Sequence, residues 1–303
     1  MDKIAFVFSG QGSQYTGMGK ELYDCSGAAR DVFELADEIR PNTSKQCFEL
    51  DKSELSKTVN TQPCLYCVDL AAADALKEAG IKADAVAGFS LGEVPALAFA
   101  GIMSRRDAFS YVVKRGEYMD ECTKTEKGAM AAILSLENSV VEEMCSHFER
   151  VYPVNYNCNK QLVVAGREDE IDAMCEQVKE IGGRAVKLAV SGAFHSPYMQ
   201  QASEKIAEYL KGVEFGKPEI PVYANVTAQP YGSDAAGLIS RQVKSPVRWQ
   251  ETVENMIKDG INIFVEVGAG KTLRGLIKKI NSDVKVYNVE DRATLEKTVA
   301  ELK

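Results

Sequence analysis

Two short apolar runs, each followed by glycines, constrain the fold of this chain most. Residues 3–8 read KIAFVF and pass directly into Ser-Gly-Gln-Gly, and residues 83–89 read ADAVAGF and are followed one residue later by LGEVPALAFAG, a helical pattern that ends at Gly101. Similar runs occur at 221–226 (PVYANV) and 262–268 (NIFVEVG). Strands buried on both faces have this composition, and they occur mainly in parallel sheets that are covered by crossover helices. The sequence therefore predicts an α/β core.

The pattern changes at about residue 126. AMAAILSL, VYPVNYN, QLVVAG and RAVKLAV are typical of strands, whereas ENSVVEEMCSHFER and REDEIDAMCEQVKEIGG are typical of helices. Their order is β-α-β-β-α-β, which is the split βαβ arrangement of ferredoxin-like units. We therefore expect residues 126–190 to form a small domain inserted into a larger one made of residues 1–125 and 191–303.

Composition excludes several classes of protein. The net charge of −8 argues against general nucleic-acid binding, which needs a basic surface. No run of eighteen apolar residues occurs, and the apolar run near the start is too short for a signal peptide, so we expect a cytoplasmic protein that does not enter the membrane. The eight cysteines have no framework spacing, which favours free thiols. Cys64 and Cys67 suit a helix core better than a redox or metal site, and no metal is expected.

The stretch GFSLGE at 88–93 matches the G-x-S-x-G turn that presents a nucleophilic serine between a strand and a helix. Ser90 could equally be an ordinary polar residue at such a turn. A serine hydroxyl needs an adjacent base to become a nucleophile, and the chain has two histidines. His147 lies in a charged helical pattern, whereas His195 lies in the loop SGAFHSPYM. If Ser90 is catalytic, His195 is therefore the expected base.

Two backbone N–H groups are expected to stabilise the negatively charged oxygen that forms during acyl transfer. The N–H of Leu91 follows the nucleophile, and a second N–H is expected from the loop GQGSQ at 10–14, which also follows a buried strand. No histidine follows His195, unlike the order in an ordinary α/β-hydrolase, where the histidine comes late. A Ser-His pair oriented by a backbone carbonyl is therefore the simpler hypothesis.

Seven motifs in this order resemble those of the malonyl-CoA:acyl carrier protein transacylase family, and together they span most of the chain. They are FSGQGSQYTGMG near the start, GFSLGE, KRGEYM, GAMAAI, NYNCNKQLVVAG, GAFHSPYM and VEVGAGKTLRGLI. The resemblance implies an α/β-hydrolase-like large domain with a mainly parallel sheet and an inserted ferredoxin-like βαββαβ domain. It also implies that Ser90 carries the acyl group and that His195 is its general base.

The resemblance assigns four further roles. The backbone N–H groups of Gln11 and Leu91 correspond to the oxyanion hole, and the backbone carbonyl of Gln242 corresponds to the group that orients the histidine. Arg115, in KRGEYM, corresponds to the arginine that binds the free carboxylate of the malonyl group. Helical spacing alone places Arg115 at the edge of an apolar face, where it could reach a carboxylate in a pocket or merely cover the core boundary.

Two residues depart from or complicate the pattern. The family usually has histidine where this chain has Phe89, which makes the pocket wall more apolar and puts side-chain contacts to the acyl group in doubt. Pro95 lies early in the following helix and lacks an N–H, so it is expected to loosen or kink the first turn.

The implied function is transfer of a malonyl group from malonyl-CoA to the phosphopantetheine thiol of acyl carrier protein, through a malonyl-serine, for fatty acid biosynthesis. The alternatives are a trans-acting polyketide acyltransferase, an acyl-thioester hydrolase or a non-catalytic binding module. No permanently bound cofactor is expected, and a monomer is expected from the family. An acidic carrier needs a basic surface, and one helix face provides a candidate at Lys271, Arg274, Lys278 and Lys279.

Overall fold

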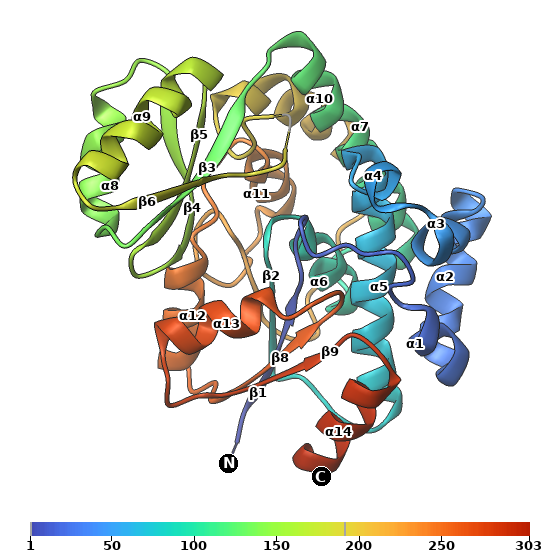
Figure 1. The fold of residues 1–303 in the computed structure, drawn as a ribbon. Helices are drawn as coiled ribbons and strands as arrows, with labels where there is room; N and C mark the ends of the chain where they lie inside the picture. The colour runs from blue at the N-terminus through green and yellow to red at the C-terminus, as the bar shows by residue number, and fades with distance from the viewer. Residues whose placement is uncertain (1, 191) are drawn as a thin grey trace.

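Two β-sheets surrounded by helices make up the structure, a computed structural model that describes residues 2–190 and 192–303 (Figure 1). Sheet A has five strands in the order β7-β2-β1-β8-β9, and every neighbouring pair in it is parallel. Its strands are β1 (Ile4–Phe8), β2 (Ala85–Gly88), β7 (Val222–Tyr223), β8 (Ile263–Val267) and β9 (Lys285–Val289).

The central strands of sheet A are covered on both faces, as their apolar composition predicts. Successive side chains of β1 point to opposite faces, so Phe6 and Phe8 enter one apolar cluster while Ala5 and Val7 enter another. The first cluster contains apolar residues of α5 (Thr58–Glu78), α6 (Glu93–Phe99) and α7 (Arg105–Thr125). The second contains residues of α12 (Trp249–Lys258) and α13 (Thr272–Ile280). Sheet A is thus the middle layer of the large domain.

Sheet B is a separate antiparallel sheet in the order β4-β5-β3-β6, and it lies in the upper left of Figure 1. Along the chain its elements are β3 (Ala129–Leu134), α8 (Asn138–Ser146), β4 (Val151–Cys158), β5 (Gln161–Gly166), α9 (Glu168–Glu180) and β6 (Arg184–Lys187). This βαββαβ order confirms the ferredoxin-like prediction. The domain boundaries at 126 and 190 stay a prediction, although sheet B and its helices fall between them.

Sheet B is tied to the large domain through its strand β4. The Val247 N–H donates to the Val154 carbonyl over 2.8 Å, and the Tyr156 N–H donates to the Val247 carbonyl over 2.9 Å. These two bonds flank Asn155, whose backbone forms a parallel bridge with Val247. The junction between the two domains therefore has a fixed register at this point.

Two details of sheet A differ from the sequence prediction. The strand predicted at 221–226 is reduced to β7, because the Asn225 N–H donates to the Glu93 carboxylate over 2.6 Å instead of continuing the ladder. Strand β9 was not predicted at all. It lies at the edge of the sheet and its burial alternates, so its sequence KVYNV lacks a continuous apolar run.

The mixed α/β class, with a mainly parallel sheet and an inserted antiparallel one, is confirmed. No helix among the described residues is long and apolar enough to cross a membrane. The remaining helices pack mainly against other helices, and the last of them lies against β9. They are α1 (Lys20–Cys25), α2 (Gly27–Ile39), α3 (Thr43–Glu49), α4 (Lys52–Leu55), α10 (Gln200–Leu210), α11 (Ala235–Gln242) and α14 (Arg292–Leu302), with short 3-10 turns η1 (Ser90–Gly92) and η2 (Pro197–Met199).

Candidate active site

Ser90 sits at a sharp turn between β2 and α6, and its backbone has a left-handed φ of 53°. The chain crosses itself closely here. A Cβ on Gly88 would lie 1.9 Å from the backbone carbon of Gly92, and a Cβ on Gly92 would lie 2.3 Å from the Phe8 carbonyl oxygen. Only glycine fits at either position, which explains the G-x-S-x-G spacing. A left-handed serine is strained, and such strain persists where the surrounding structure enforces it.

Side-chain amides enforce this backbone conformation. The Ser90 N–H donates to Asn225 Oδ1 over 2.8 Å, and the Ser90 carbonyl accepts from Gln242 Nε2 over 2.7 Å. Asn225 Nδ2 also donates to the Gly88 carbonyl over 2.6 Å. Asn225 is itself fixed by the buried Glu93, whose pKa burial raises to about 7. The turn is therefore held from outside by two carboxamides.

His195 is placed to accept the proton of Ser90. Its Nε2 lies 2.6 Å from Ser90 Oγ, and its Nδ1 lies 3.0 Å from the Gln242 carbonyl oxygen and 3.1 Å from that of Ser245. A carbonyl only accepts, so Nδ1 carries the hydrogen and the lone pair of Nε2 faces the serine. The contact to the Gln242 carbonyl is the one the family resemblance implies, and the second carbonyl was not foreseen.

The pKa of His195 is lowered to about 4, first because the ring is buried and second because the positive charge of Arg115 is close. The two backbone carbonyls act in the opposite direction, since they stabilise the protonated ring. The imidazole is consequently neutral at pH 7. A neutral imidazole with a free lone pair on Nε2 is the state that a general base requires.

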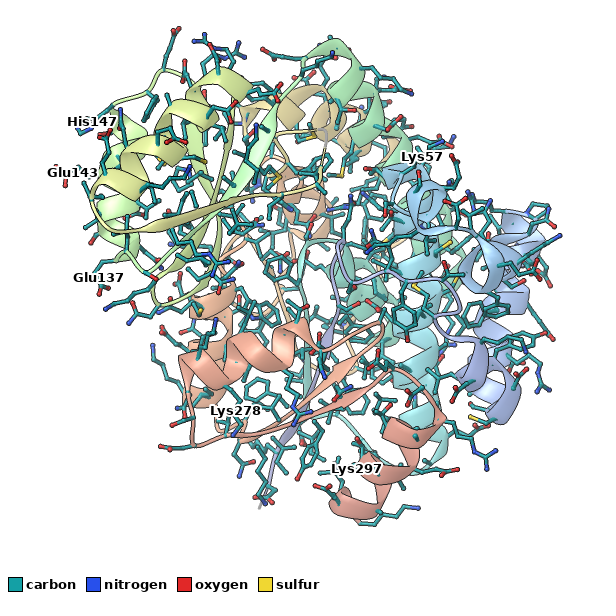
Figure 2. The ribbon with its side chains drawn as sticks, viewed as in Figure 1. Lys57, Glu137, Glu143, His147, Lys278 and Lys297 are labelled. Atoms are coloured by element: carbon teal, nitrogen blue, oxygen red, sulfur yellow. The ribbon has the colours of Figure 1, made fainter. Side chains whose placement is uncertain are left out.

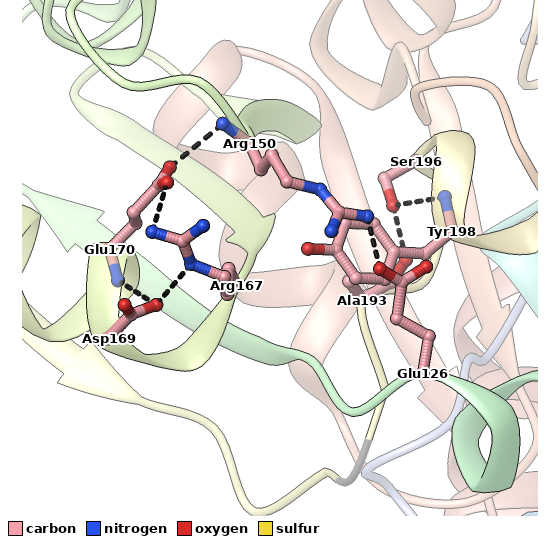
Figure 3. Close-up of polar contacts among 8 residues, drawn as sticks. All are labelled: Glu126, Arg150, Arg167, Asp169, Glu170, Ala193, Ser196 and Tyr198. Atoms are coloured by element: carbon pink, nitrogen blue, oxygen red, sulfur yellow. Dashed lines mark hydrogen bonds and ion pairs between the residues drawn. The ribbon is translucent and has the colours of Figure 1, made fainter.

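The segment that carries His195 is fixed by hydrogen bonds within itself and by contacts from the inserted domain (Figure 3). Ser196 Oγ donates to the Ala193 carbonyl over 2.5 Å and accepts from the Tyr198 N–H over 3.3 Å. The guanidinium of Arg150, the residue just before β4, lies 4.7 Å from the centre of the Tyr198 ring and also pairs with Glu126. The His195 N–H also donates to the Val243 carbonyl over 2.9 Å, so this segment is anchored to the inserted domain as well as to the large one.

Arg115 lies in the middle of α7 with its side chain 1% exposed. Its Nη1 donates to Gln62 Oε1 over 2.8 Å, and its Nη2 donates to Gln242 Oε1 over 2.9 Å and lies 3.4 Å from Ser90 Oγ. The acceptors in Gln62 and Gln242 belong to neutral amides, and Arg115 Nε has no hydrogen-bond partner among the described residues. Burial lowers the pKa of Arg115. Among the described residues, no carboxylate forms an ion pair with this buried guanidinium beside the serine, although the more distant charge of Glu93 acts on it.

A cavity of about 80 Å³ opens over these groups. This volume is far below the roughly 300–1,000 Å³ of sites that enclose a whole drug-sized ligand, so it suits a small acyl group. A larger cavity of about 660 Å³ lies beside α12, but neither Ser90, Arg115 nor His195 lines it. The small cavity is lined by polar Gln11, Ser90, Arg115, Asn155 and His195 and by apolar Phe89, Met119, Met130, Leu188, Val190 and Phe194.

The two predicted oxyanion donors lie next to this cavity. Gln11 lines the cavity, and its side-chain Nε2 donates to Thr58 Oγ1 over 3.4 Å. Leu91 is fully buried and directly follows Ser90 in η1. The structure thus brings together all six residues that the sequence singled out for the site. The chemical roles given to them stay predictions.

Phe89 packs edge-on against Trp249, with ring centres 5.6 Å apart and an angle of 67° between the rings, and it lines the cavity. The more apolar wall expected from this residue is present. The effect expected of Pro95 on the first turn stays a prediction. The helix α6 begins at Glu93, so Pro95 is its third residue and occupies a turn whose N–H groups have no intrahelical partner anyway.

The residues that the sequence placed outside the site do lie elsewhere. His147 is exposed at the end of α8 and appears on the outer edge of the inserted domain in Figure 2. Cys64 and Cys67 are buried in α5, and no cluster of three or more potential metal-binding side chains occurs among residues 2–190 and 192–303. The predicted basic face lies on α13, where Lys278 bonds the carbonyls of Ser282 and Val284.

Sequence reasoning missed the amide network around the serine. Gln62, Asn225 and the side chain of Gln242 come from α5, the segment after β7 and α11, and no spacing in the sequence joins them. For Asn225 a signal was available, because a buried asparagine two residues after a short strand needs partners for its amide. The sequence itself could not identify Ser90 as that partner.

A parallel sheet, a strained serine at a strand-to-helix turn and a neutral histidine at its hydroxyl are features of serine-dependent acyl-transfer proteins. Comparisons with known proteins agree. The family described as acyl transferase domain matches residues 5–296. The malonyl CoA-acyl carrier protein transacylase of Bacillus subtilis is 41% identical over 311 residues, which cover 100% of this chain and 98% of the relative.

Solved structures show the same relationship. The malonyl CoA-acyl carrier protein transacylase of Clostridium perfringens superposes with a TM-score of 0.95 at 37% identity, covering 99% of this chain and 97% of the other. A malonyl-transacylase solved in complex with a type II PKS acyl-carrier protein has a TM-score of 0.95 at 33% identity, covering 99% of this chain and 100% of the other. The chain belongs to the malonyl CoA-acyl carrier protein transacylase family.

Proposed function

We propose that this enzyme moves a malonyl group from malonyl-CoA to the phosphopantetheine thiol of an acyl carrier protein, through a malonyl ester on Ser90. The observation that carries this proposal is the placement of Arg115, a buried cation without a carboxylate partner, 3.4 Å from the serine hydroxyl. A dicarboxylic thioester supplies both the carbonyl that the serine attacks and the carboxylate that the arginine lacks.

In the first half-reaction, His195 Nε2 takes the proton of Ser90 as Oγ bonds to the thioester carbonyl carbon. The carbonyl oxygen becomes negatively charged and is stabilised by the backbone N–H groups of Gln11 and Leu91. When the intermediate collapses, the carbon–sulfur bond breaks and His195 returns the proton to the departing thiolate of CoA. The left-handed conformation of Ser90 keeps its hydroxyl at the histidine throughout.

In the second half-reaction, the thiol of the carrier arm gives its proton to His195 and its sulfur attacks the serine ester. Ser90 recovers the proton as the ester bond breaks, so the enzyme is regenerated. The small size of the cavity and its apolar wall limit the access of water to the ester, which favours transfer over hydrolysis. No permanently bound cofactor takes part in either step.

The basic face of α13 is proposed to receive the acidic carrier. None of Lys271, Arg274, Lys278 and Lys279 forms an ion pair with a described carboxylate. Arg274 Nη1 donates to Asn288 Oδ1 over 3.1 Å, and Lys279 Nζ donates to Gln161 Oε1 over 3.2 Å. Their charges therefore remain available to a partner, in a chain whose net charge is −8. We further propose that the enzyme is a cytoplasmic monomer that serves fatty acid biosynthesis.

Intact-mass measurement after mixing with malonyl-CoA tests the proposal. We expect an adduct of one malonyl group that is absent in Ser90→Ala and is lost when carrier protein bearing its phosphopantetheine arm is added, with malonyl carrier as the product. Rapid loss of the adduct to water without a carrier would instead favour a thioester hydrolase, and no adduct at all would favour a binding module. Replacing the fatty acid carrier by a polyketide carrier distinguishes the two pathways.

A further inference from the structure

Asn155 is a polar residue of the cavity that has no role in either half-reaction. It lies on β4, lines the same cavity as Ser90 and His195, and is 8% exposed. Its Oδ1 is buried and has no hydrogen-bond partner among the described residues. Gln11, Ser90, Arg115 and His195, the other polar residues of the cavity, each have at least one side-chain hydrogen bond to the protein.

The fold holds this carboxamide in place. The backbone on either side of Asn155 is pinned to Val247 by the two hydrogen bonds that join the domains, and the ladder between β4 and β5 shifts register next to it. The side chain therefore cannot move to another partner by a small shift of the strand. Leaving a buried acceptor unpaired costs about 1–3 kcal/mol, which a ligand with a matching donor would relieve.

The malonyl group cannot supply that donor. At neutral pH its carboxylate and its thioester carbonyl only accept hydrogen bonds, and the site already offers cationic and N–H donors for both. The pantetheine arm, by contrast, has a secondary amide two carbons from the sulfur. Such an amide carries an N–H for Oδ1 and a carbonyl for Nδ2, so it can match both ends of the asparagine side chain.

We propose that Asn155 binds the amide of the pantetheine arm nearest the sulfur and so places the thioester or thiol at Ser90. This inference rests on the proposed function and adds a residue to its substrate site. CoA and the carrier protein share the same arm, so Asn155 acts in both half-reactions. A neighbouring cavity of about 420 Å³ shares Gln11, Leu188 and Val190 with the small one and offers room for the rest of the arm.

Two acceptor thiols test the proposal, because they differ only at the amide. N-acetylcysteamine carries the amide, and 1-pentanethiol has the same chain length with methylene groups in its place. We measure the second-order rate constant for transfer from malonyl-Ser90 to each thiol. In Asn155→Ala we expect about a tenfold loss or more with N-acetylcysteamine, as is typical of one or two lost hydrogen bonds, and a change of less than about twofold with 1-pentanethiol.

Asn157→Ala is the matched control. Asn157 also lies on β4, is 7% exposed and has an unpaired buried Oδ1, but it does not line the cavity. Its variant should slow transfer to both thiols equally or not at all. An equal loss with both thiols in Asn155→Ala, or no loss with either, would overturn the proposal.

A second variant covers the case in which Asn155→Ala does not fold. Asn155→Ser keeps a small polar side chain, and it should show the same selective loss. The wild-type enzyme provides a further check, because it must prefer N-acetylcysteamine to 1-pentanethiol, and equal rates would overturn the inference. A wild-type enzyme that forms no malonyl-Ser90 would refute the proposed function itself, which is a different result.

Discussion

Two arginines of the same helix, α7, differ in burial and in whether a carboxylate pairs with their charge. Arg105, at the first position of the helix, makes two hydrogen bonds of 2.5 and 2.8 Å to the carboxylate of Asp74. Its side chain is 40% exposed, whereas that of Asp74 is 3% exposed. Arg115, three turns further on, is almost completely buried, donates to two amide oxygens, lies beside the serine hydroxyl and forms no ion pair with a carboxylate of the described residues.

The difference separates a structural cation from a functional one. Arg105 compensates a buried carboxylate, whose pKa is nevertheless raised because burial outweighs the charge of the arginine. Arg115 is buried without such compensation, and a desolvated charge that the protein leaves unpaired is costly. The fold tolerates this cost where the missing partner is a carboxylate that arrives with the substrate. Each of the following experiments tests a part of this contrast.

The largest expected effect is the loss of malonyl transfer in Arg115→Ala. Removing one member of a buried, hydrogen-bonded charge pair costs about 2–5 kcal/mol, which is roughly a 30- to 5,000-fold loss in kcat/KM. Acylation by acetyl-CoA, which has no carboxylate, should change much less. The measurement is the ratio of malonyl to acetyl adduct on Ser90 when both donors compete. Arg105→Ala is the control, and an unchanged ratio in Arg115→Ala would remove the carboxylate assignment.

Arg105→Ala should instead lower stability. It leaves the carboxylate of Asp74 buried without its partner, a change that costs about 3–5 kcal/mol for a fully buried pair and about 0–1 kcal/mol for an exposed one. Arg105 is partly exposed, so we expect an intermediate loss of about 1–2 kcal/mol. Denaturant unfolding measures it. Asp74→Asn combined with Arg105→Ala should recover part of the loss, and full stability of the single variant would contradict the interpretation.

Arg115→Met should have a smaller effect on stability. Removing the buried charge relieves its desolvation cost, but it also leaves the buried Oε1 atoms of Gln62 and Gln242 without their donor, so we expect the free energy of unfolding to change by no more than about 1 kcal/mol. The variant should therefore lose activity toward malonyl-CoA yet be about as stable as the wild type. A loss of stability comparable to that of Arg105→Ala would mean that Arg115 also has a structural role.

The same contrast explains what the sequence could and could not predict. Local patterns identified β1, β2 and β8, since strands in the middle of a parallel sheet are apolar along their whole length. They also identified Ser90, because the close approach of Gly88 to Gly92 leaves a glycine spacing in the sequence. Edge strand β9, whose burial alternates, carried no such signal.

Contacts between distant segments could not be predicted from the residues alone. Gln242 is 152 positions from Ser90 and 127 positions from Arg115, yet its side chain bonds both, while its backbone carbonyl contacts His195. The family resemblance pointed to the backbone carbonyl only. The burial of Arg115 also depends on distant segments. Helical spacing only placed this arginine at the edge of an apolar face, whereas the amide oxygens that accept its hydrogen bonds come from α5 and α11.

The smallest expected effect is a shift in pH dependence, which tests whether the charge of Arg115 acts on His195. Protonated His195 cannot accept the serine proton, so acylation in the wild type should be lost as the pH falls through about 4. Burial is the first cause of this low pKa and remains in Arg115→Met, whereas the repulsion by the guanidinium is removed. We therefore expect the loss in the variant to begin at a higher pH, still below the value of about 6.5 for a free histidine.

The rate of adduct formation with acetyl-CoA measures this shift, because acetyl transfer does not need the arginine. Arg105→Ala should keep the wild-type profile, and an identical midpoint in Arg115→Met would show that burial alone sets the pKa of the base.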